Sequence, residues 1–161
     1  MFEVETRHKM QFDSSQAWRD ECVDRWPYEI ARGVYEFPIR VLKDANGKRK
    51  STMDYSSYMS DGNPSTYSDT FRKTTYDMYK AHFDKLFGST RAPIIILTHF
   101  QADLLGGKAY YLAMKDFAKE VCSKPNVRCT TISEAVAWIK SNKKLYSSLP
   151  RGDEACAYPT R

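Results

Sequence analysis

The chain has 161 residues, enough for one domain with a hydrophobic core and too few for two ordinary domains. Hydrophobic residues make up 42% of it and aromatic residues 14%, a composition that excludes a disordered protein. The net charge is +5 with basic residues scattered along the chain, so we expect no nucleic-acid partner. No stretch reaches the roughly 18 apolar residues of a membrane span, and the N-terminus lacks the layout of a signal peptide.

The first half of the chain predicts short strands and a loop. Residues 1–9 are typical of the end of a helix, and residues 11–15 of a short strand that ends in a polar turn. Residues 33–42 alternate apolar and polar side chains over part of their length, which predicts a strand, and Asn46-Gly47 marks a turn after it. Residues 51–67 are rich in Ser, Asp, Gly, Asn and Tyr. We expect them to form a long irregular loop of the kind that is often functional.

The second half predicts three helices. The first covers residues 69–87, where Ser68 or Asp69 can cap it and Gly88 ends it. The second covers about 107–123, with apolar side chains at helical spacing. The third begins at Thr131, which forms a capping-box pattern with Glu134. The apolar faces of the first two helices contain Tyr76, Tyr79, Phe83 and Leu86, and Tyr110, Ala113, Phe117 and Val121.

A run of β-branched residues precedes a histidine. Ile94-Ile95-Ile96-Leu97 is apolar on both faces, which predicts a central parallel strand with all three isoleucines strongly buried and a neighbouring strand at 127–130. Alternating helices and strands favour an α/β fold with right-handed crossovers. In such folds chemistry lies at the C-terminal ends of strands, so His99 is a candidate catalytic residue. The alternative is a hydrogen-bonded structural histidine.

Four cysteines allow two disulfides in three pairings. Cys122 would end a helix and Cys129 would lie in the next strand, so these two could be bridged, with free cytosolic thiols as the alternative. No CxxC pair is present, which disfavours a zinc site built on cysteine.

Several segments, in order, resemble the closing part of the polysaccharide deacetylase family, and its chitin deacetylase branch in particular. The matching segments are Phe2-Glu3, Phe12-Asp13-Ser14-Ser15, Trp26-Pro27-Tyr28, Gly33-Val34-Tyr35-Glu36-Phe37-Pro38, Arg91-Ala92-Pro93, Leu97-Thr98-His99, Asn126 to Ser133, and the helix with Trp138. The resemblance touches most of residues 1–140.

The resemblance implies a fold and an activity. The fold is part of a distorted (β/α) barrel with parallel strands, here without its N-terminal strands. The activity is metal-dependent removal of N-acetyl groups from a carbohydrate polymer such as chitin. In this family an aspartate and two histidines hold a divalent metal, commonly zinc, and a second aspartate acts as base on the metal-bound water. The histidine of the Leu-x-His motif protonates the leaving amine.

This sequence departs from the family pattern at the metal and base motifs. The Thr-Phe-Asp-Asp, His-x-x-x-His and Arg-x-Pro-Tyr motifs are absent, and His8, His82 and His99 have no partner at i,i+4 spacing. We therefore expect the C-terminal half of a deacetylase domain, through truncation, an incomplete gene model or a degenerate copy. Zinc would belong to the complete domain, with none held by this chain alone.

The resemblance assigns roles to four residues. His99 matches the catalytic acid, and Leu97 matches the neighbouring apolar pocket wall. Trp26 matches, more loosely, an aromatic side chain beside the acetyl pocket. Asp24 is a candidate for the carboxylate that orients His99, although its spacing to Trp26 departs from the family's Asp-Trp pair, and a surface carboxylate is the alternative.

Residues 1–141 are therefore expected to form a partial deacetylase-like domain, and residues 142–161 an irregular tail. Family resemblance places the protein outside the cell or at its surface. Two other hypotheses remain. One is a non-catalytic carbohydrate-binding protein that uses aromatic rings, and the other is an unrelated α/β domain with a core histidine. The candidate rings are Tyr35, Tyr55, Tyr58 and Tyr67.

Overall fold

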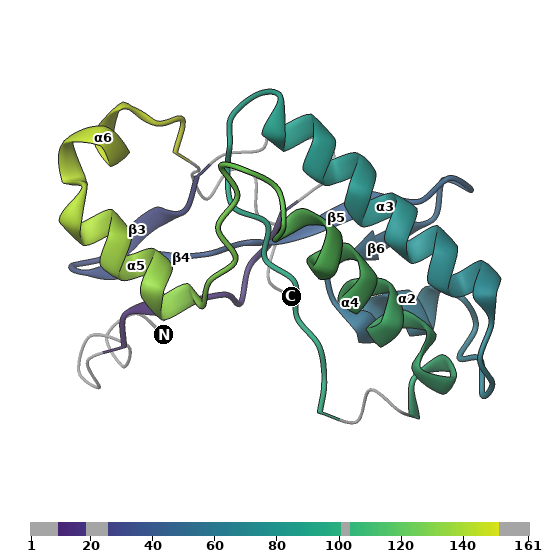
Figure 1. Cartoon of the computed structure of the whole chain (residues 1–161). Helices are drawn as coiled ribbons and strands as arrows, with labels where there is room; N and C mark the ends of the chain where they lie inside the picture. Colours follow the sequence, from purple (N-terminus) through teal and green to yellow (C-terminus); the bar gives the residue numbers. More distant parts are fainter. Residues whose placement is uncertain (1–9, 19–25, 101–103, 152–161) are drawn as a thin grey trace.

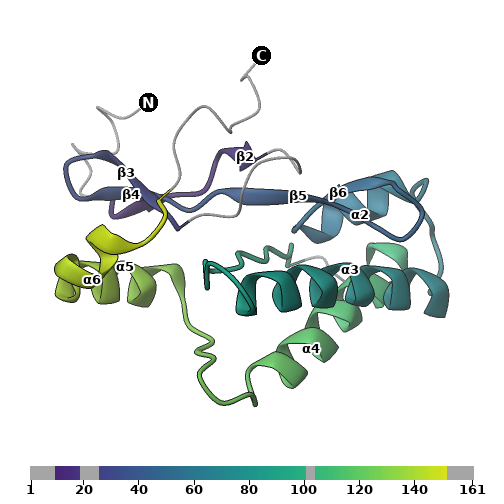
Figure 2. The same cartoon turned by 90° about the horizontal axis from the view of Figure 1, so that it is seen from above.

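The computed structural model describes residues 10–18, 26–100 and 104–151, and it shows a mixed α/β architecture (Figure 1). The expectations for residues 1–9 and for Asp24 lie outside these ranges. Two three-stranded sheets form one layer, and the helices α3, α4, α5 and α6 cover the same side of it (Figure 2). The α/β class is thus confirmed, but the described strands form two small sheets and no closed barrel.

The first sheet has the order β1-β4-β3, with β1 at Phe12–Asp13, β3 at Tyr28–Ala31 and β4 at Val34–Glu36. The second has the order β2-β5-β6, with β2 at Ala17–Trp18, β5 at Ile39–Lys43 and β6 at Arg49–Ser51. The pairs β1–β4 and β2–β5 are parallel, whereas β3–β4 and β5–β6 are antiparallel. The single strand predicted over 33–42 is therefore two strands. Phe37 and Pro38 separate them, and the chain passes from one sheet to the other there.

The helix predictions are confirmed. Helix α3 spans Asp69–Phe87, and the Ser68 side chain caps it by accepting a hydrogen bond from the Phe71 N–H. Helix α4 spans Ala109–Val121 after a short 3₁₀ turn, η2, at Gly106–Lys108. Helix α5 spans Ile132–Ser141 and begins at the expected capping box. These helices follow the sequence pattern because an apolar face at helical spacing is a strong local signal.

Two segments expected to be irregular contain helices. Helix α2 at Asp54–Ser60 lies inside the predicted loop, and α6 at Lys143–Ser148 begins the predicted tail. In α6 the buried Tyr146 donates a hydrogen bond of 2.5 Å to the Pro27 carbonyl. Both helices are short, so tertiary contacts rather than periodicity stabilise them.

The prediction of a central isoleucine strand is wrong. Residues 91–96 belong to no strand, and among the described residues the segment makes a parallel bridge at Leu97, with Met53. Ile94, Ile95 and Ile96 are only half-buried, and 127–130, predicted as the flanking strand, is also unpaired. β-Branched residues favour extended backbone, but pairing needs a neighbouring strand, which no local pattern supplies.

The isoleucine segment lies between two groups of buried side chains. Ile95 packs against the sheet cluster, and Ile94 and Ile96 pack against the helix cluster. Alternate side chains thus point to opposite cores, as in a strand. The sheet cluster is Tyr35, Phe37, Val136, Ile139 and Tyr146, and the helix cluster is Met78, Tyr79, Phe83, Phe117 and Val121.

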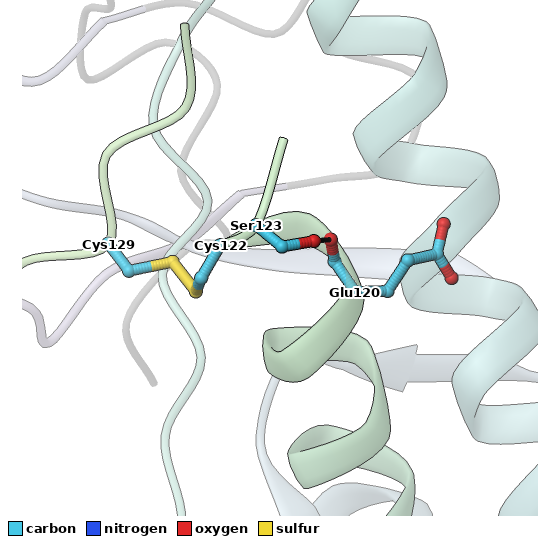
Figure 3. The surroundings of a disulfide bond; sticks show 4 residues. All are labelled: Glu120, Cys122, Ser123 and Cys129. Atoms are coloured by element: carbon cyan, nitrogen blue, oxygen red, sulfur yellow. Dashed lines mark hydrogen bonds between the residues drawn. A yellow bond between two sulfur atoms is a disulfide. The ribbon is translucent and has the colours of Figure 1, made fainter. Parts of the chain in front are cut away.

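A disulfide joins Cys122, at the end of α4, to Cys129 (Figure 3). Of the two alternatives for this pair, a bridge or free thiols, the structure thus has the bridge. The two Cα atoms are 5.6 Å apart, within the normal range. Beside it the Ser123 hydroxyl donates a 2.8 Å hydrogen bond to the Glu120 carbonyl. The bridge closes the turn that leads toward α5.

The capping box of α5 predicts a pH-dependent contribution to stability. Hydrogen bonds to its carboxylate lower the pKa of Glu134 from 4.5 to about 2. The largest effect comes from the Thr130 hydroxyl, and the Thr131 N–H and hydroxyl add smaller ones. A carboxyl whose pKa is lower in the folded state stabilises that state above its unfolded pKa and loses this effect as pH falls. We expect the stability difference between wild type and Glu134→Gln, measured by urea unfolding, to shrink between about pH 5 and pH 2. A difference that stays constant over this range would contradict the assignment.

Candidate functional site

The candidate site forms where the isoleucine segment meets the start of α2. The Leu97 N–H donates to the Thr52 carbonyl at 3.0 Å, and the Asp54 N–H donates to the Leu97 carbonyl at 3.2 Å. These two bonds fix the register between the segments. They bring His99, two residues beyond Leu97, against Asp54, the first residue of α2.

Asp54 holds both the backbone and the ring of His99. The His99 N–H donates to Asp54 Oδ2 at 2.8 Å, and His99 Nδ1 lies 2.7 Å from Asp54 Oδ1. The Asp54 side chain is 2% exposed, whereas the His99 side chain is 47% exposed. A buried carboxylate therefore anchors a half-exposed imidazole.

This arrangement sets the protonation geometry of the ring. A carboxylate only accepts hydrogen bonds, so the bond at Nδ1 requires a proton on that nitrogen. Nε2 is then left as the nitrogen that exchanges a proton with a ligand. A histidine oriented by a carboxylate in this way is a standard general acid or base.

Two tyrosines surround the pair. Tyr79 of α3 is buried. Its burial raises the pKa of its phenol, and the negative charge of Asp54 raises it further by a smaller amount. On the solvent side, the Tyr55 ring lies 5.7 Å from the His99 ring, centre to centre. The Tyr55 N–H also donates to Asp54 Oδ1 at 2.7 Å, which gives the carboxylate another donor.

The far end of α2 is held by a buried ion cluster. Lys50 Nζ lies 3.1 Å from Asp44 Oδ2 and 2.9 Å from Asp61 Oδ2, and these side chains are at most 4% exposed. Asp61 is the C-terminal cap residue of α2 and also accepts a hydrogen bond from the Tyr110 hydroxyl at 3.1 Å. Burial raises the pKa of Asp44, but hydrogen bonds from Lys50 and from backbone N–H groups outweigh it and lower that pKa overall. Helix α2 is thus anchored at both ends.

The structure brings together only part of the predicted site. Leu97 and His99 lie at the same place, and the orienting carboxylate beside them is Asp54. Asp24, the predicted candidate for that role, lies outside the described residues. Asp54 was missed because it falls in the predicted loop and no spacing rule connects positions 54 and 99. Its local signal was an acidic residue at a position where a helix can begin.

Trp26 occupies a different environment from the one predicted. Its ring stacks on Trp138 at 5.6 Å between centres, and its Nε1–H donates to the Thr90 carbonyl at 2.9 Å. It lines an open, mainly apolar cavity of about 640 Å³ between the two clusters, together with the isoleucine segment. His99 is not among the described residues that line this cavity. The structure therefore separates Trp26 from the Asp54–His99 pair.

Within the described ranges, no group of three or more His, Cys, Asp or Glu side chains could hold a metal ion. Likewise, no helix in those ranges has both the length and the apolar character needed to cross a membrane. Comparison of the sequence with known proteins found no matching family profile and no matching curated protein.

The buried ion cluster predicts that Lys50 is essential for stability. Lys50→Ala removes the buried cation between Asp44 and Asp61 and leaves Asp61 with the half-exposed Lys48 at 3.6 Å, and we expect a loss of about 3–5 kcal/mol in the free energy of unfolding. Urea denaturation measures it. The matched control is Lys73→Ala, because Lys73 is 74% exposed and pairs with Asp77 on the surface of α3. That change should cost less than about 1 kcal/mol, and equal losses in the two variants would contradict the account.

The Asp54–His99 pair predicts a defined tautomer. In the wild type the neutral ring carries its proton on Nδ1, because Asp54 accepts a hydrogen bond there. We expect Asp54→Asn to remove this constraint, since an amide both donates and accepts. Imidazole ¹⁵N chemical shifts report which nitrogen is protonated. Asp77→Asn, which changes an exposed carboxylate on α3, should leave the His99 shifts unaltered. Identical His99 shifts in wild type and Asp54→Asn would contradict the proposed contact.

Proposed function

We propose that this chain supplies the catalytic acid of a polysaccharide deacetylase, with His99 as the acid and Asp54 as the residue that positions it. The observation that carries the proposal is the geometry of the pair, a buried carboxylate on Nδ1 and a half-exposed ring. The resemblance of Leu97-Thr98-His99 to the family's acid motif supports it independently of that geometry.

The chemistry of these residues follows from their hydrogen bonds. Asp54 keeps the proton on Nδ1, so Nε2 is the nitrogen that delivers a proton to a leaving amine. An amine is a poor leaving group unless it is protonated as the C–N bond breaks, which is the task that a positioned imidazole performs. To act as an acid the ring must carry a proton on both nitrogens, so that Nδ1 keeps its proton toward Asp54 while Nε2 gives its proton to the amine.

The family's metal does not fit the residues described here. Apart from His99 and Asp54, which already bind each other, the site offers no set of ligands, and the metal-binding motifs are absent from the sequence. We derive no step through a metal. The proposal assigns metal and base to the remainder of a complete domain, and it assigns the acid to this chain.

The unpaired isoleucine segment supports the idea that the chain is part of a larger barrel. Residues 94–96 are apolar, their side chains pack alternately against the two clusters, and they have no sheet partner among the described residues. Such a segment is suited to accept a neighbouring strand, because within the part of the chain that the structure describes no strand pairs with it and an edge of this kind is a template for pairing. The proposed barrel would complete this pairing.

The proposed location is extracellular or at the cell surface. The Cys122–Cys129 disulfide supports it, because disulfides persist in oxidising compartments and are rare in the cytosol. The proposed substrate is an N-acetylated amino-sugar polymer such as chitin.

The test is the effect of His99→Ala on acetate release from N-acetylglucosamine oligomers, in a complete domain that joins this chain to the missing metal-binding motifs. Protonation of the amine occurs in the transition state, so we expect kcat to fall by about 10²–10⁴-fold with little change in KM. The chain alone should release little or no acetate in the same assay, with or without added zinc.

Two outcomes would contradict the proposal. One is normal kcat in His99→Ala together with lower thermal stability, which would make His99 structural. The other is an inactive complete domain that still binds the oligomers, which would favour a carbohydrate-binding protein. Lys73→Ala is the matched surface control, and it should leave kcat and KM unchanged.

A further inference from the structure

Helix α2 presents two tyrosines on the face next to His99. Tyr55 and Tyr58 are three residues apart, so their side chains lie on the same side of the helix. Their ring centres are 5.9 Å apart with an interplanar angle of 38°, and the Tyr55 ring lies 5.7 Å from the His99 ring. The three rings form a continuous row that ends at the proposed acid.

The Tyr55 and His99 rings of this row are open to solvent, and Tyr58 is half-buried behind them. Tyr55 is 46% exposed, and Phe100, the residue after His99, is 95% exposed. Neither residue belongs to the sheet cluster or the helix cluster. Large aromatic side chains usually bury their rings, so several exposed ones beside a catalytic candidate indicate a surface that binds a ligand.

We propose that Tyr55 and Tyr58 form a stacking platform for a sugar ring of the glycan, in the subsite next to the one where His99 acts. The inference rests on the proposed function and adds the residues that bind the polymer. Tyrosine suits this task because its ring covers the apolar face of a sugar while its hydroxyl stays in water. The contact with His99 then sets the register of the chain relative to the acid.

The charge of the site favours a neutral polymer. The Asp54 carboxylate lies directly behind the His99 ring, at 2.7 Å from Nδ1. That carboxylate is buried and offers an approaching polymer no charge, and helix α2, which carries both tyrosines, contains no lysine or arginine to bind the phosphates of an anionic polymer such as a nucleic acid. An N-acetylated glycan carries no charge and needs no such cation.

The experiment is a titration of the full 161-residue chain with tetra-N-acetylchitotetraose, followed by NMR of the tyrosine rings. We expect the oligomer to bind the wild type with a dissociation constant of about 1 mM, as for a single shallow subsite. Tyr55→Ala should weaken binding about tenfold, whereas Tyr55→Phe, which keeps the ring, should stay within about twofold. Tyr111→Ala is the matched control, since Tyr111 is a tyrosine of similar exposure, 36%, on another helix.

The outcomes separate this inference from the proposed function. Binding that is undetectable in the wild type, unchanged in Tyr55→Ala or equally weakened in Tyr111→Ala overturns the platform, whatever the role of His99. Tighter binding of a single-stranded oligonucleotide than of the sugar also overturns it. Binding that follows the expected order while His99→Ala retains full kcat in a complete domain supports the platform and overturns only the role of His99.

Discussion

The burial of Asp54 is the constraint on which the candidate site depends. A carboxylate that is 2% exposed must be compensated by donors, because an unpaired buried charge costs several kcal/mol. Its donors are the His99 backbone, the His99 ring and the Tyr55 N–H. One charge therefore fixes the start of α2, the end of the isoleucine segment and the orientation of the imidazole. Removal of Asp54 would release all three at once.

The rest of the fold holds the two partners of this contact in place. The isoleucine segment is packed between the sheet cluster and the helix cluster, so the path that leads to His99 is supported on both sides. Helix α2 is anchored at its other end, where Asp61 pairs with the buried Lys50. The two anchors restrain α2 along its whole length, although it has only 7 residues. Short helices need such contacts because their own hydrogen bonds barely stabilise them.

The sequence predicted the features that local patterns encode. The spacing of Tyr79, Phe83 and Leu86 located α3, and Thr131 with Glu134 located the start of α5, because amphipathic spacing and capping are properties of neighbouring residues. The isoleucine strand and α2 were predicted wrongly, because strand pairing and short buried helices depend on distant partners. His99 was found through its place after an apolar run. Asp54 was missed because a contact between residues 45 positions apart has no local signature. The role of His99 remains a proposal.

A double-mutant cycle tests the central claim most directly. Acetate release is measured for a complete domain with Asp54→Asn, with His99→Ala and with both changes. If Asp54 acts through the His99 ring, its substitution has no further effect once the ring is gone, and the double variant has the same kcat as His99→Ala. If the two losses instead multiply, the residues act independently, and the account of a positioned acid at this site is wrong.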